Sequence, residues 1–151
     1  MKLLPILIAA LLLAGCASTV TRATPEALRA APGATLRIVS PKSYDLAYRK
    51  TLDQMKSCYE RKMGLMGSAQ TTVWGDKGDK EAQVSLAFSS IFNYRIFSTI
   101  VLVPEAGGTA VTLYSTGEQP PPALVSALKT WLIDDGAGCP GDIPPQTQEA
   151  K

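Results

Sequence analysis

The residues from Gln70 to Thr116 constrain the fold most, because they form a succession of short apolar segments separated by turns. Between residues 82 and 89 apolar and polar side chains alternate, which is typical of a half-buried strand. In all, four segments in this part of the chain are predicted as strands, over residues 70–74, 82–89, 95–103 and 109–116. Gly78 and Gly107-Gly108 lie in the turns between them, and such short loops favour an antiparallel meander.

Two stretches outside this region have the periodicity of helices. Apolar residues recur every three or four positions from Tyr44 to Lys62, which predicts an amphipathic helix ending near Gly64. A second helix is predicted after prolines 120–122, with Leu124, Leu128, Trp131 and Leu132 on one face. A brief strand is predicted at residues 34–39. We therefore expect an α+β fold, a two-layer sandwich in which two helices cover one face of an antiparallel sheet of 4–5 strands.

The N-terminus has the features of a secretory signal. Lys2 precedes an apolar run of 11 residues, Leu3 to Leu13, which is shorter than the roughly 20 residues that span a bilayer. Leu13-Ala14-Gly15-Cys16 matches all four positions of the lipobox, Leu-[Ala/Ser]-[Gly/Ala]-Cys, and the chain resembles bacterial lipoproteins in this segment. The resemblance implies cleavage before Cys16 and a covalent lipid on its sulfur. The alternative is an ordinary signal peptide followed by a chance cysteine.

The residue after Cys16 bears on the location of the protein. Ala17 stands where an aspartate would resemble the signal for retention in the inner membrane. The resemblance therefore implies the inner leaflet of the outer membrane, facing the periplasm. The rest of the chain is loosely similar to small proteobacterial outer-membrane lipoproteins, through Ser57-Cys58-Tyr59 and Gly107-Gly108-Thr109. These motifs are too short to imply any catalytic residue.

The expected organisation has one domain. Residues 1–15 are the signal peptide, 16–33 the lipidated N-terminus and a linker, 34–139 a single α+β domain, and 140–151 a disordered tail. Within the linker, Thr24-Pro25-Glu26 has the pattern of a helix start.

Cys58 and Cys139 remain as an even pair once Cys16 is lipidated, and we expect them to form a disulfide in an oxidising compartment. A redox-active pair is the alternative, but it usually has Cys-x-x-Cys spacing. Because antiparallel helices would place Cys139 at the wrong end for Cys58, residues 135–138 would have to fold back.

Composition argues against several functions. Lys2 is the one charged residue of the signal, so 15 basic residues become 14 against 13 acidic ones, and no basic excess predicts nucleic-acid binding. The chain has no histidine, the commonest general base. Ser126 and Lys129 match Ser-x-x-Lys, but the companion motifs of that acyl-enzyme chemistry are missing. We expect no enzymatic activity, no metal, and no cofactor beyond the lipid on Cys16.

Two candidate surfaces remain. The segment from Ile91 to Phe97 is rich in aromatic residues, and Phe92, Tyr94 and Phe97 are candidates for a partner surface; packing under a helix is the alternative. A groove between helix and sheet is the second candidate, lined by Tyr44, Tyr48, Met55, Ile100 and Tyr114. The first predicts a membrane-tethered periplasmic binding module for an envelope protein or other envelope component. The second predicts a carrier of a lipid or other hydrophobic small molecule.

Overall fold

The computed structural model describes residues 24–63 and 67–140. This part of the chain forms three helices and six strands. The helices are α2 (Pro25–Ala30), α3 (Tyr44–Tyr59) and α4 (Pro122–Leu132), and the strands are β1 (Ala34–Ser40), β2 (Arg61–Met63), β3 (Ala69–Lys77), β4 (Ala82–Ser90), β5 (Asn93–Glu105) and β6 (Gly108–Ser115). The α+β class and the antiparallel sheet are confirmed. The expected numbers were too low, because α2 and β2 are additional elements.

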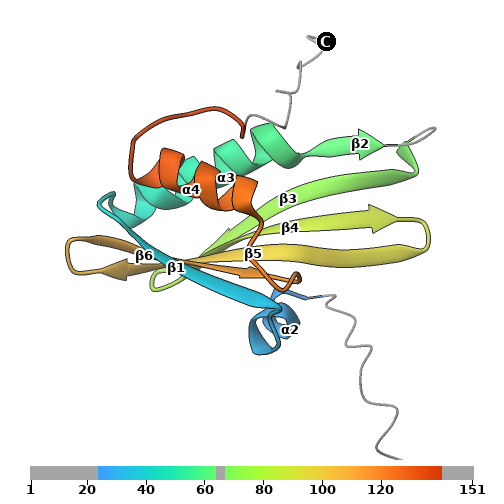
Figure 1. The fold of residues 1–151 in the computed structure, drawn as a ribbon, viewed down its shortest axis with the longest axis horizontal. Coiled ribbons are helices and arrows are strands. Elements are labelled where there is room, and N and C mark those ends of the chain that lie inside the picture. The colour runs from blue at the N-terminus through green and yellow to red at the C-terminus, as the bar shows by residue number, and fades with distance from the viewer. Residues whose placement is uncertain (1–23, 64–66, 141–151) are drawn as a thin grey trace, which may run out of the picture.

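The sheet is a meander with one added edge strand. Its order is β1-β6-β5-β4-β3-β2, and every neighbouring pair is antiparallel. Strands β2 to β6 follow one another in sequence, whereas β1 pairs with β6 and α3 connects it to β2 at the opposite edge (Figure 1). Strand β2 has three residues, Arg-Lys-Met, which is too short for an alternating pattern to reveal it.

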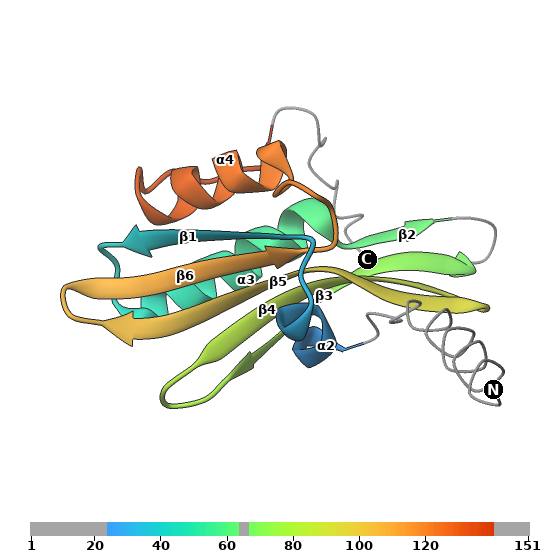
Figure 2. The same ribbon diagram turned by 60° about the horizontal axis from the view of Figure 1, so that its bottom comes forward.

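Helices α3 and α4 lie on one face of the sheet and α2 lies on the other (Figure 2). The main core lies beneath α3 and α4. It joins the apolar stripe of both helices to the side chains on that face of the strands, and its large members include Met55, Ile100, Leu102, Leu128 and Trp131. The predicted face of the second helix is therefore confirmed.

Helix α2 belongs to the folded body, although the sequence placed its residues in the linker. The Thr24 hydroxyl accepts a hydrogen bond from the Ala27 N–H at 3.2 Å, which caps the helix start as its sequence predicts. Leu28 is fully buried and packs against Ala87 and Ile96 in a second, smaller core. The folded body thus includes α2, which precedes the expected boundary at residue 34.

A β-bulge in β5 reverses which side chains of this strand face α3. The register shifts between Leu86 and Ala87, so that Leu86 pairs with Ser98 and Ala87 with Ile96, and Phe97 has no partner on β4. One extra residue reverses the alternation of side chains beyond it. As a result Ile96 packs on the α2 side, while Ile100 packs beneath α3.

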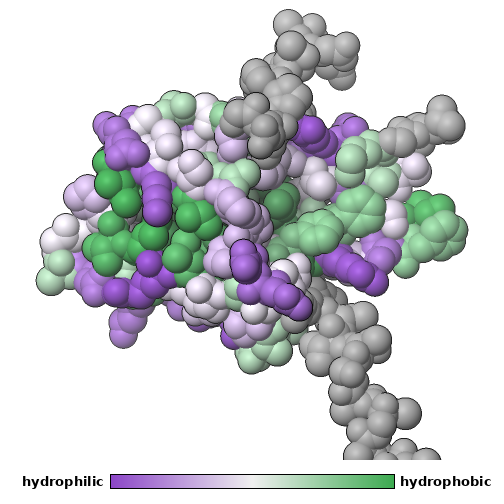
Figure 3. Space-filling view, viewed as in Figure 1, coloured by the Kyte–Doolittle hydropathy of each residue, from purple (hydrophilic) through white to green (hydrophobic). Residues whose placement is uncertain are grey.

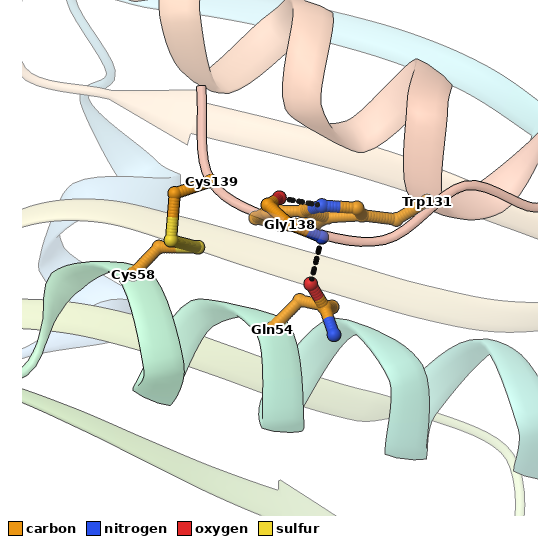
Figure 4. Close-up of a disulfide and its surroundings, with 5 residues drawn as sticks. All are labelled: Gln54, Cys58, Trp131, Gly138 and Cys139. Atoms are coloured by element: carbon orange, nitrogen blue, oxygen red, sulfur yellow. Dashed lines mark hydrogen bonds between the residues drawn. A yellow bond between two sulfur atoms is a disulfide. The ribbon is translucent and has the colours of Figure 1, made fainter. Parts of the chain in front are cut away.

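The Cys58–Cys139 disulfide is present and confirms the predicted pairing. After α4 the chain folds back along α3 in a return segment, residues 133–139 (Figure 1). The Gly138 N–H donates to Gln54 Oε1 at 2.8 Å, and Trp131 Nε1 donates to the Gly138 carbonyl at 2.8 Å (Figure 4). These contacts hold the segment beside the disulfide.

Candidate functional site

The turn between β4 and β5 holds the two large apolar side chains with the highest exposed fractions among the described residues. Ile91 is 74% exposed and Phe92 is 91% exposed, and Tyr94 and Phe97 are 43% and 41% exposed. We call these four residues the apolar surface, and Ile91 and Phe92 the apolar turn. Apolar residues of this region gather at the right edge of the space-filling view (Figure 3).

Two polar residues close this turn. Ser90 pairs with Asn93, so Ile91 and Phe92 are the two residues of the loop. The Ser90 hydroxyl accepts a hydrogen bond from the Phe92 N–H at 3.3 Å and donates to the Asn93 carbonyl at 3.4 Å. The backbone of the turn is therefore held by Ser90, and the side chains of Ile91 and Phe92 are not needed to form it.

The sheet extends past the helices at this end. In Figure 1 the β4–β5 turn lies beyond α3 and α4, and in Figure 2 it lies beyond α2. Phe97 is the bulged residue of β5, and its ring centroid lies 6.4 Å from that of Phe88. The bulge thus gives β5 an additional exposed aromatic side chain beside Phe88.

The predicted partner surface is therefore brought together in part. Phe92, Tyr94 and Phe97 are all exposed, but Tyr94 and Phe97 lie on opposite faces of the sheet, because Tyr94 shares the α2 side with Ile96 whereas Phe97 contacts Phe88 on the other side. Sequence reasoning placed the tip near Asn93 and did not select Ile91, whose exposure exceeds that of Tyr94. The signal that identifies it is a two-residue loop with no glycine, proline, asparagine or aspartate.

The five residues of the predicted groove do not line one cavity. Met55 and Ile100 are fully buried in the main core, whereas Tyr114 packs on the opposite face with Trp74 and the α2 core. The strand alternation separates them, because Ile100 pairs with Leu113 and Tyr114 points to the opposite face of β6.

The two remaining tyrosines of that group pack at the start of α3. Tyr44 donates its hydroxyl proton to the Gly78 carbonyl at 2.7 Å. Tyr48 lies over β3 at Gly75, where a Cβ atom would stand 2.7 Å from the Tyr48 hydroxyl oxygen. Glycine at this position therefore lets α3 approach the sheet, and the space between the two is filled by side chains.

A polar hollow of about 490 Å³ lies beside β2 and β3. Its lining consists of Glu60, Arg61, Lys62, Gln70, Thr71 and Thr72. The hollow mixes acidic, basic and hydroxyl groups, so it lacks the apolar lining that a hydrophobic ligand requires.

The carboxylate of Asp135 has a pKa well below that of a free aspartate. Its Oδ1 atom accepts hydrogen bonds from Lys42 Nζ and Lys50 Nζ, each at 2.6 Å, and these two bonds lower its pKa to about 2. The backbone of Asp135 has φ of 59°, the left-handed conformation that turns the chain back after α4. The arrangement holds the return segment against α3, and it is a structural ion cluster.

Sequence reasoning did not identify this cluster. Lys50, Gln54 and Cys58 are spaced by four residues, so they form one line along α3. Asp135, Gly138 and Cys139 contact these three residues in order. The four-residue spacing is visible in the sequence. The contacts of these residues with a segment over 80 residues away could not be predicted from it.

Other chemistry finds no support among the described residues. No group of three or more His, Cys, Asp or Glu side chains there could hold a metal ion. Asp79 and Glu81 lie near the β3–β4 turn, and Glu81 forms a two-pronged ion pair with Arg29 of α2.

None of the helices in residues 24–63 and 67–140 is long and apolar enough to cross a membrane. Cys16 lies outside the described residues, and so does the predicted tail beyond residue 140.

Neither a comparison with protein-family models nor a search of curated proteins found a match for this chain.

Proposed function

We propose that this chain is a lipid-anchored protein of the bacterial envelope whose domain acts as a non-enzymatic binding module. The lipid on Cys16 would hold it at the inner leaflet of the outer membrane, facing the periplasm. The apolar surface would be the part of the domain that meets its partner. The exposure of Phe92 is the observation that carries the proposal, because a large aromatic side chain that is 91% exposed is typical of an interaction site.

Two further observations support a binding role over a carrier role. The contact between α3 and the sheet is filled by buried side chains such as Met55 and Ile100, which leaves no room there for a hydrophobic cargo. The disulfide and the Asp135 ion cluster tie α4 to α3 and oppose separation of these helices. A rigid body with an exposed apolar turn fits a module that presents a surface.

The anchor is tested by the mass of the mature protein purified from its native host. We expect a chain that begins at Cys16 and carries added acyl mass, and we expect the Cys16→Ser variant to keep its precursor mass. A wild-type mature chain without acyl mass would refute the anchor.

The binding surface is tested by crosslinking in living cells. A photoreactive amino acid at position 92 is compared with one at position 46, because Leu46 is also exposed, at 52%, but lies on α3. We expect crosslinks from position 92, to an envelope protein or to phospholipid, and none from position 46. An absence of crosslinks at position 92, with the variant present at normal levels, would refute the role of the apolar surface.

A further inference from the structure

The β4–β5 turn differs in composition from the β3–β4 and β5–β6 turns at the opposite end of the sheet. The β3–β4 turn contains Gly78 and Asp79, and the β5–β6 turn contains Gly107 with φ of 86°, as expected for turns in water. The β4–β5 turn at the other end of the sheet consists of Ile91 and Phe92, which are strand-forming residues. Residues that do not favour turns, at a turn whose backbone is held by neighbouring residues, are typical of a functional site.

Charged residues also differ between the two ends, and the turns of the opposite end carry both signs, including Lys77 and Lys80. The stretches 61–75 and 82–104, which form β2 and most of β3, β4 and β5, contain three charged residues, Arg61, Lys62 and Arg95, and all are basic. The acidic residues Asp76, Asp79, Glu81 and Glu105 lie at or beside the turns of the opposite end. Exposed basic residues, Lys62 and Arg95, therefore lie near the apolar turn, and Glu60 lies close to Lys62 at the edge of the sheet.

The basic residues are set back from the apolar turn by a short, defined distance. The strand register places Lys62, Gln70, Ser89 and Tyr94 in one row across the sheet, one residue nearer the turn than the row that contains Arg95. Lys62 and Arg95 are both exposed and project from opposite faces of the sheet. Arg95 follows Phe92 by three residues, which is roughly 10 Å along an extended strand. An apolar tip with basic groups about 10 Å behind it matches the depth profile of a bilayer interface, where apolar side chains penetrate about 5–10 Å and cations meet the headgroups.

The predicted anchor can reach the same plane as this turn. Helix α2 directs its last turn toward the opposite end of the sheet, since Arg29 binds Glu81, and its start therefore points toward the apolar turn (Figure 2). Leu28 packs against Ala87, which precedes Ser90 by three residues, roughly 10 Å. From Cys16 to Thr24 the chain has eight residue steps, which extend over at most about 29 Å.

We propose that Ile91 and Phe92 insert into the interface of an anionic phospholipid bilayer, with Lys62 and Arg95 facing its headgroups. The inference rests on the proposed anchor and names the partner of the same apolar surface. The lipid holds the chain at the membrane, and the inserted turn sets the orientation of the domain. The end with the β3–β4 and β5–β6 turns then faces the periplasm.

The test uses lipidated protein reconstituted into vesicles of phosphatidylethanolamine and phosphatidylglycerol with brominated acyl chains. The Phe92→Trp variant places a fluorophore at the turn, and Leu46→Trp is the control at a site that is also exposed, at 52%, near the other end. We expect bromine to quench the added emission at position 92 and to leave that at position 46 unchanged. The native Trp74 and Trp131 provide the baseline, which the wild-type protein measures.

Charge provides a second readout on the same variant. Because each basic residue near an anionic surface contributes about fivefold in binding, adding Lys62→Gln or Arg95→Gln to Phe92→Trp should reduce the ratio of inserted to free turn roughly fivefold. Replacing phosphatidylglycerol with phosphatidylcholine should reduce it too. Unchanged quenching in both comparisons would refute the role of the two basic residues.

The outcomes separate the two proposals. A mature chain without acyl mass refutes the anchor, whatever the turn does. An acylated chain whose position 92 is not quenched, or is quenched no more than position 46, refutes insertion and leaves the anchor standing. Crosslinks from position 92 to a protein, combined with an unquenched turn, would assign the apolar surface to a protein partner and also overturn insertion.

Discussion

Breaking the Cys58–Cys139 disulfide should lower the stability of the domain without unfolding it. The bond closes a loop with a sequence separation of 81 residues. In the chain-entropy treatment, a crosslink over a loop of this length stabilises the folded state by about 4.5 kcal/mol. Since whole domains have unfolding free energies of about 5–15 kcal/mol, the bond accounts for a large share of the total.

The reduced protein should remain folded because other contacts hold the same segment. Gln54 and Trp131 both bind Gly138, and Asp135 binds Lys42 and Lys50. These contacts act in the native state, whereas the crosslink acts mainly on the unfolded chain. The loss should therefore appear as a lower unfolding midpoint with native-like structure retained below it.

The measurement compares oxidised and reduced wild-type protein by urea unfolding, followed through the fluorescence of the buried Trp131. In thermal unfolding, 4.5 kcal/mol corresponds to a decrease in Tm of roughly 15–20 °C for a domain of this size. The Cys139→Ala variant should match the reduced protein. Cys58→Ala should be slightly less stable, because the Cys58 side chain is fully buried and its loss also leaves a small cavity.

Equal midpoints for the oxidised and reduced protein would refute this reasoning. So would free thiols in protein isolated from its native compartment. A reduced protein that is wholly unfolded would show instead that the contacts of the return segment with α3 do not support the fold without the crosslink.

Three further predictions follow from the described contacts. Asp135 has a folded-state pKa of about 2 against about 3.9 in an unfolded chain, so its stabilising contribution is complete above about pH 4 and is lost as the pH falls toward 2. The Asp135→Asn variant should be less stable than wild type at neutral pH and match it near pH 2 in urea titrations; parallel curves would contradict this. Leu28→Ala should cost about 2–5 kcal/mol in the same assay, because Leu28 is fully buried, and a loss near zero would mean that α2 is only a linker. Phe92→Ser should change the unfolding free energy by less than about 0.5 kcal/mol, since the ring is exposed, and a large loss would show that the turn has a structural role.

The local pattern of the sequence was sufficient for the elements that have a clear period. The alternation at residues 82–89 predicted β4, and the recurrence from Tyr44 predicted α3, which ends three residues earlier than expected, at Tyr59. The cysteine pair was predictable because only two cysteines remained after the lipobox. In each case the signal lies within one segment or in a simple count, so no knowledge of distant contacts was required.

The tertiary structure alone decided which faces and ends these elements share. A one-residue bulge at Phe97 moved Ile96 to the face opposite Ile100, and the pairing of strands placed Tyr114 away from Met55. The return of Asp135 to Lys42 and Lys50 joins residues that are far apart in the chain. Such contacts arise from the register between strands and from packing across the core, which depend on the whole chain, whereas sequence periodicity reports only how each segment divides its own side chains between two sides.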